Sequence, residues 1–127
     1  MTGTRRFIIA VPGVPPSPSP ITNAVVVAGT CHISGQIAVY HDGYCPGTAR
    51  EEAARAFELV FAIGREAGFE PNEIVYVDLA FADLDDLPAV NELYGELFEQ
   101  RPARTVYQAA QLPCGAKVKV QAIAMKG

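Results

Sequence analysis

Two stretches of the chain space their apolar residues as amphipathic helices do. The first, residues 49–68, places apolar side chains near the i, i+3, i+4 period of a helix face. Thr48-Ala-Arg-Glu51 just before it predicts a capping box, and Gly68 predicts its end in a left-handed conformation. The apolar face of this helix is predicted to comprise Ala53, Ala56, Phe57, Val60, Phe61, Ile63 and Ala67.

The second helical pattern follows the acidic segment Asp83–Asp86, which we interpret as its cap, with Pro88 in the first turn. Its end is predicted at Arg101-Pro102. Its buried stripe is predicted to comprise Val90, Leu93, Tyr94, Leu97 and Phe98.

β-Strands account for most of the remaining apolar runs, and Gly29 between two of them predicts a hairpin. Residues 74–82 are almost continuously apolar, which is typical of a central strand covered on both faces. The other expected strands cover residues 5–11, 23–28 and 30–37, together with two strands of the C-terminal quarter joined at residues 112–115.

Side chains alternate between two faces along these last two strands. Arg104, Val106 and Gln108 are expected to share one face of the first strand, opposite Thr105, Tyr107 and Ala109. In the second strand, Lys117, Lys119 and Gln121 are expected opposite the apolar set Val118, Val120 and Ala122.

Two segments are predicted to lack helix and strand. Residues 12–20 contain five prolines and should run extended over the surface, where they could form a lid. Residues 40–47 are expected to form a loop. The resulting order, β-β-β-α-β-α-β-β, predicts an α+β fold with two helices on one face of a mixed sheet.

Composition narrows the class of protein. A chain of 127 residues is expected to form a single domain, residues 1–127. Because 50% of the residues are hydrophobic and only 19% are charged, apolar surface should remain for a subunit interface. A net charge of −4 argues against a nucleic-acid partner. Without an apolar run long enough for a membrane span or a signal pattern, the expected location is cytoplasmic.

The cysteines and histidines do not predict a metal site. Cys31, Cys45 and Cys114 contain no CxxC spacing, so reduced thiols are favoured over disulfides. His32 and His41 are not spaced as paired ligands on a helix. A zinc site built from Cys31, His32 and Cys114 is the less favoured alternative.

Five segments, taken in order, carry a resemblance to a known family. They are Ser34-Gly-Gln-Ile37, the helix of residues 49–68, Asn91-Glu-Leu-Tyr-Gly-Glu-Leu-Phe98, Arg104 within Pro-Ala-Arg-Thr, and Val120-Gln-Ala-Ile-Ala124. Together they resemble the Rid family (YjgF-like proteins, including reactive enamine/imine deaminases). The resemblance extends from about residue 20 to the C-terminus, and the chain looks like a divergent member.

The resemblance implies a chorismate-mutase-like fold that assembles as a homotrimer, with sites in clefts between subunits. It also implies cofactor-free hydrolysis of a carboxylate-bearing enamine or imine to a keto acid and ammonia. Arg104 would grip the substrate carboxylate, and backbone of the Ser34-Gly35 segment would contact it from the neighbouring subunit. Asn91 matches a family asparagine. Taken from spacing alone, Arg104 could also be a solvated strand-end residue, and Asn91 a helix-surface one.

Three positions depart from the family pattern. Lys119 stands where the family has a water-orienting glutamate, Ile21 where it has a tyrosine, and Val106 where it has a cysteine. A lysine ammonium cannot accept a hydrogen bond, so it cannot replace the carboxylate. Lys119 could favour a ligand of greater negative charge, act as a base or Schiff-base nucleophile of lowered pKa, or point into solvent.

The preferred function is therefore deamination of a specialised enamine or imine. A non-catalytic ligand-binding protein is one alternative. A divergent pathway enzyme, which uses the same cleft for isomerisation or bond-forming chemistry, is another.

Overall fold

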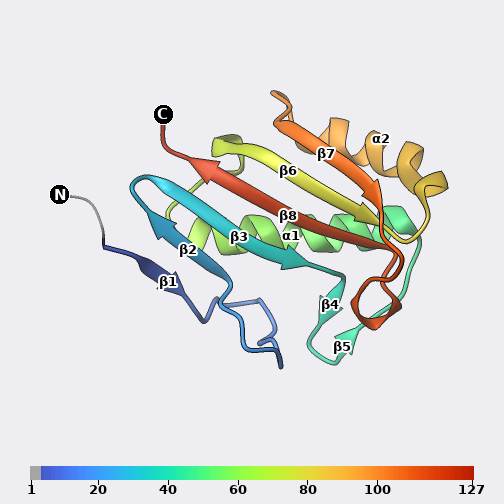
Figure 1. Ribbon diagram of the computed structural model, residues 1–127, viewed down its shortest axis with the longest axis horizontal. Helices are drawn as coiled ribbons and strands as arrows, with labels where there is room; N and C mark the ends of the chain where they lie inside the picture. The colour runs from blue at the N-terminus through green and yellow to red at the C-terminus, as the bar shows by residue number, and fades with distance from the viewer. Residues whose placement is uncertain (1–3) are drawn as a thin grey trace.

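The computed structural model describes residues 4–127 and shows a mixed sheet with two α-helices (Figure 1). The helices are α1 (Ala49–Glu66) and α2 (Leu87–Leu97). The strands are β1 (Arg6–Ile8), β2 (Ala24–Val27), β3 (Thr30–Gln36), β4 (Val39–Tyr40), β5 (Gly43–Tyr44), β6 (Ile74–Phe81), β7 (Ala103–Gln108) and β8 (Val118–Met125). Short 3₁₀ turns are η1 (Pro71–Glu73), η2 (Leu84–Asp86) and η3 (Pro113–Gly115).

The main sheet has the strand order β1-β2-β3-β8-β6-β7, with both helices on one of its faces (Figure 1). This arrangement confirms the predicted α+β class. The pair β6 and β7 is parallel, because α2 carries the chain back across the sheet, and the other neighbours are antiparallel. The two C-terminal strands do not pair, because β6 lies between them.

The face toward the helices forms the core. Val77, Leu79 and Phe81 of β6 lie beside Ala122, Val120 and Val118 of β8, and all six are almost completely buried. On α1, Phe57 is fully buried and meets Tyr94 and Phe98 of the α2 region edge to face. The predicted apolar stripes of both helices therefore meet over the sheet.

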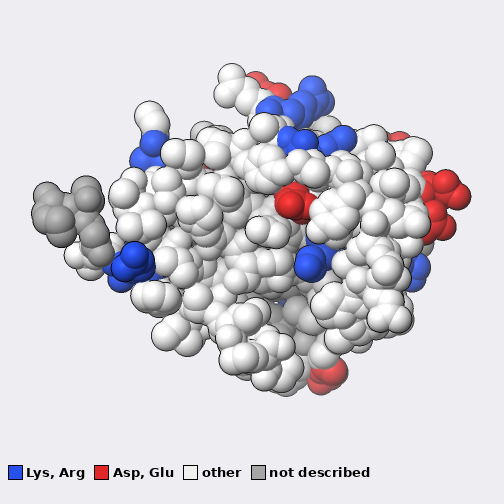
Figure 2. Space-filling view, viewed as in Figure 1, with Lys and Arg blue, Asp and Glu red and all other residues white. Residues whose placement is uncertain are grey.

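No helix covers the other face of the sheet, which we call the outer face. Its side chains include Tyr76, Asp78 and Ala80 of β6 beside Ile123, Gln121 and Lys119 of β8. Figure 2 views the molecule from this side; most of the visible surface is uncharged, although acidic and basic atoms lie near its middle as well as along the rim. Large apolar side chains on it that are more than 40% exposed include Phe7, Tyr107 and Met125.

Helix α1 begins and ends as the sequence predicts. The hydroxyl of Thr48 accepts from the backbone N–H of Glu51, and the Glu51 carboxylate accepts from the N–H of Thr48. After the helix, Gly68 has a φ of 96°, a conformation that glycine adopts without strain.

Several local expectations are corrected. Residues 40–47 are not simply a loop, because β4 and β5 form a small hairpin around the positive-φ residue Gly43. The first strand is only three residues long. Asp83 caps η2 rather than α2. The proline-rich segment begins with a turn that buries Val14, so it does not lie wholly on the surface.

Within residues 4–127, neither α-helix is long and apolar enough to cross a membrane.

The zinc site considered from the sequence requires Cys31 and His32 to bind the same ion. Cys31 points into the core whereas His32, its neighbour in β3, is exposed on the outer face. The two side chains therefore cannot ligate one ion, and the zinc alternative is wrong.

Candidate active site

Arg104 lies on the edge strand β7, on the side of the sheet that faces α2. Its Nη1 donates to Oδ1 of Asn91 over 2.8 Å, and its Cζ lies 4.8 Å from the centre of the Tyr94 ring. Both partners are uncharged, so Arg104 is positioned without being neutralised. Burial raises the pKa of the Tyr94 phenol, and the charge of Arg104 partly offsets this rise.

Asn91 is exposed on α2 and contacts Arg104, which gives it a role in orienting the guanidinium. Val106 follows on the same side of β7, half-buried against the core. We call Arg104, Asn91, Tyr94 and Val106 the edge group. Its exposed end presents the remaining guanidinium donors, arranged as a planar fork that suits a carboxylate.

The Ser-Gly-Gln segment lies at an irregularity of β3. The register of β3 against β8 shifts between Ile33 and Gln36, which takes Ser34 and Gly35 out of the regular ladder. The Ser34 hydroxyl donates to the carbonyl of Thr22 over 2.6 Å, so it holds the preceding segment instead of facing solvent freely. Ile21, immediately before Thr22, is 56% exposed.

Lys119 lies across Gly35. A Cβ at Gly35 would be 3.2 Å from Cδ of Lys119 and 3.4 Å from its Cγ and Cε. The lysine stem therefore occupies the space that a side chain at position 35 would need. We call Ser34, Gly35 and Lys119 the outer-face group.

The edge group and the outer-face group are on opposite faces of the sheet. Arg104 pairs with Val77, whose side chain points toward the helices, whereas Lys119 pairs with Ala80, on the outer face. Within one chain, the structure thus brings Arg104 together with Asn91, and Gly35 together with Lys119, but it does not bring the two sets together.

One charged residue with a large structural role was missed from the sequence. Glu52 on α1 is almost fully buried and accepts from the Tyr44 hydroxyl at 2.8 Å, the Lys117 N–H at 2.9 Å and the Gly47 N–H at 3.2 Å. Its carboxylate also pairs with Lys117 Nζ at 3.3 Å. These contacts fix the start of β8, two residues before Lys119.

Burial alone would raise the pKa of the Glu52 carboxyl, but the hydrogen bonds from Lys117, Gly47 and Tyr44 outweigh it and leave the pKa lowered. Burial, reinforced by the bond to Glu52, raises the pKa of Tyr44 to about 12. The sequence did contain a signal, because Glu52 precedes Ala56 by one helical turn and so shares the buried face.

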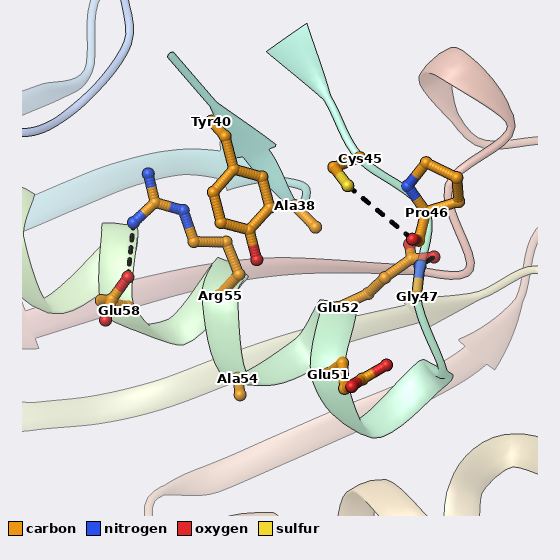
Figure 3. Close-up of a pocket in the computed structure, with 10 residues that line it drawn as sticks. All are labelled: Ala38, Tyr40, Cys45, Pro46, Gly47, Glu51, Glu52, Ala54, Arg55 and Glu58. Carbon is orange, nitrogen blue, oxygen red and sulfur yellow. Dashed lines mark hydrogen bonds and ion pairs between the residues drawn. The ribbon is translucent and has the colours of Figure 1, made fainter. Parts of the chain in front are cut away.

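A separate pocket lies between the β4–β5 hairpin and the first half of α1 (Figure 3). Arg55 lies against the Tyr40 ring in it, 4.6 Å from the ring centre, and is paired with Glu58. None of the predicted site residues lines this pocket. Since its single guanidinium is neutralised and three carboxylates line it, those of Glu51, Glu52 and Glu58, it does not suit a carboxylate ligand.

The fold and these two groups define the class: a chorismate-mutase-like α+β protein with an arginine at the edge of an open-faced sheet. Residues 15–126 match the family described as Endoribonuclease L-PSP. The chain belongs to this family, the Rid family of RidA and YjgF.

Individual relatives agree over nearly the full length. A mouse protein named 2-iminobutanoate/2-iminopropanoate deaminase is 35% identical, covering all of this chain and 96% of the relative. The human protein of the same name is 33% identical, covering all of this chain and 95% of the relative. Among solved structures, the YjgF gene product of E. coli is 30% identical with a TM-score of 0.87, covering 94% of this chain and 98% of that one. E. coli TdcF, solved with bound serine, is 29% identical with a TM-score of 0.88, covering 96% and 100%.

Proposed function

We propose that this protein is a Rid-type deaminase that hydrolyses a carboxylate-bearing enamine or imine. The observation that carries the proposal is Arg104, which is held by Asn91 and Tyr94 and has no carboxylate partner among residues 4–127. The names of the mouse and human relatives support the same reaction class. The reaction consumes water: an imine of a 2-oxo acid plus one water gives the 2-oxo acid and one ammonia.

The active protein is a homotrimer with its sites between chains. Arg104 and Gly35 lie on opposite faces of one sheet, so a ligand can touch both only if they come from different chains. The outer face also offers exposed apolar surface for a subunit contact. In this arrangement, the edge group of one chain faces the outer-face group of the next.

Each group has a distinct task in the cleft. Arg104 binds the substrate carboxylate and fixes the imine carbon in position. The backbone around Gly35 contacts the ligand from the neighbouring chain. Lys119 offers donors but no acceptor, so it cannot orient water as a carboxylate would. Simple 2-aminoacrylate-type imines should therefore be poor substrates, and the natural substrate is a specialised one.

Ammonia release provides the test. Imines are generated in the reaction mixture by an amino-acid oxidase, and the rate of ammonia formation is compared with and without the protein. The proposal requires that the protein accelerates release for at least one amino acid in a panel and that Arg104→Ala abolishes the acceleration. If no imine in the panel is hydrolysed faster, the deaminase function is wrong.

A non-catalytic ligand-binding protein is the second candidate, favoured by the loss of the family glutamate at Lys119. Binding of 2-oxo acids without any turnover of imines would establish it. The third alternative, a pathway enzyme that forms a Schiff base at Lys119, predicts a covalent adduct that borohydride traps on that residue.

A further inference from the structure

Within the described residues 4–127, Lys119 differs from the other two lysines of the chain because it has no anionic partner. Lys117 pairs with Glu52 at 3.3 Å, and Lys126 pairs with Glu73 at 3.0 Å. Lys119 makes no hydrogen bond or ion pair within residues 4–127, although it is half-buried. An ammonium that is not paired with a carboxylate of its own chain keeps its charge available to an arriving anion.

Within residues 4–127, no carboxylate on the outer face forms an ion pair with Lys119. Its cross-strand neighbour on β6 is Ala80, and its stem lies against Gly35. The carboxylate closest by register is Asp78, which pairs with Gln121 two residues away, and no ion pair joins Asp78 to Lys119. The ammonium is thus available at the place where the backbone of Gly35 would meet a ligand.

In the part of the chain that the structure describes, Arg104 has no ion pair either, and its hydrogen-bond and ring partners are the neutral Asn91 and Tyr94. In the proposed trimer, Arg104 of one chain and Lys119 of the next place two positive charges at one cleft. A single carboxylate neutralises only one of them. A lysine ammonium is a point charge that suits a second carboxylate.

We propose that Lys119 binds a second carboxylate of the substrate, so that the cleft is selective for imines and enamines of 2-oxo dicarboxylates. These compounds form from amino acids with an acidic side chain. This inference rests on the proposed function, since it requires Arg104 to hold the first carboxylate. It makes Lys119 a specificity-determining residue, which replaces the simple water-orienting role of the family glutamate.

The test uses two 2-oxo acids of equal chain length that differ in one terminal group: 2-oxoglutarate ends in a carboxylate and 2-oxopentanoate in a methyl. Calorimetric titration measures both with the wild-type protein, with Lys119→Met, which keeps the stem and removes the charge, and with Lys126→Met as a matched control. Sedimentation confirms that the variants keep the wild-type assembly.

The wild type and Lys126→Met should bind 2-oxoglutarate on the order of tenfold or more tightly than 2-oxopentanoate. Lys119→Met should lose this preference and bind 2-oxopentanoate as the wild type does. Equal binding of both acids by the wild type, or a preference that survives in Lys119→Met, would overturn the inference. Tighter binding of 3-phosphohydroxypyruvate than of any dicarboxylate would overturn the carboxylate assignment.

The proposed function is tested by a different measurement, the release of ammonia from imines. If imines are hydrolysed in an Arg104-dependent way while the dicarboxylate preference is absent, the deaminase function is supported and the proposed role of Lys119 is wrong. If the dicarboxylate preference is present and depends on Lys119, but no imine is hydrolysed, the cleft binds dicarboxylates without catalysis. If neither acid binds at all, no dicarboxylate site exists and the inference is wrong.

Discussion

Arg104 shows how a residue can be charged, exposed and yet precisely placed. The amide of Asn91 and the ring of Tyr94 hold its guanidinium from two sides, and neither neutralises it. From the sequence alone, Asn91 could equally have been a helix-surface residue. The contact between the two side chains gives Asn91 an orienting role that spacing could not reveal.

We expect Arg104→Ala to leave the fold intact and to abolish carboxylate binding. A charge-assisted bidentate pair in a partly desolvated cleft contributes on the order of 2–5 kcal/mol, or roughly thirty-fold to several thousand-fold in affinity. Arg104→Lys should recover only part of this, because an ammonium is not a planar fork. Calorimetry with a 2-oxo acid measures it, and unchanged binding in Arg104→Ala would reduce Arg104 to a solvated strand-end residue.

Lys119→Glu should raise activity on simple imines such as 2-aminoacrylate. The substitution restores an acceptor at the position where relatives are expected to orient water, next to the backbone of Gly35. Ammonia release from the wild type and the variant measures the change. Brisk wild-type turnover, together with no gain in the variant, would show that backbone groups orient the water instead.

Among the elements, the helices were the most predictable part of the fold. Their apolar spacing is local, and so is the capping box at Thr48. Strand alternation correctly predicted that Arg104 and Thr105 lie on opposite faces of the sheet, as do Lys119 and Val118. Which strands become neighbours depends on contacts far apart in sequence, so the position of β6 between β7 and β8 could not be predicted from these patterns.

The polar contacts between elements were equally hidden. Glu52 joins α1 to the β4–β5 hairpin and to the start of β8, and its partners Tyr44 and Lys117 are distant along the chain. A helical glutamate is usually exposed to solvent, so the residue type alone predicted an exposed position for Glu52. Its position on the buried face was the only local signal.

Glu52→Gln should therefore destabilise the protein at neutral pH, by about 1–3 kcal/mol. A glutamine keeps one acceptor but brings an amide donor toward groups that already donate, the Tyr44 hydroxyl and the N–H groups of Gly47 and Lys117. Urea unfolding at neutral pH measures the loss. Glu58→Gln is the matched control, because Glu58 is on the same helix but largely exposed.

The pH dependence of this difference has a definite sign. Because the pKa of Glu52 is lowered in the folded protein, its ionised form stabilises the fold above the unfolded pKa of about 4.3, and this contribution is lost as pH falls through the folded value. The gap in stability between wild type and Glu52→Gln should thus shrink in acid. A gap that is constant or grows as the pH falls would contradict the assignment.

For the whole molecule, the open outer face is the dominant feature, and we expect it to be covered in a homotrimer. Sedimentation at micromolar concentration should give three times the 13.6 kDa chain mass. Ile123 lies on this face between His32 and Tyr76, and Ile123→Asp should dissociate the assembly by placing a charge there. Ligand binding should disappear with it. A wild-type protein that is only monomeric would refute both the trimer and the shared cleft.

In the proposed homotrimer, the placement of Arg104 and Gly35 on opposite faces of one sheet has a genetic consequence. A chain with an inactivating substitution at Arg104 still contributes an intact Gly35 surface to a cleft. A chain with an inactivating substitution at Gly35 still contributes an intact Arg104. Random mixing of the two inactive chains in closed rings should leave about one quarter of the clefts with both intact halves. Two defective alleles in one cell would therefore complement each other, whereas two chains with defects in the same half would not.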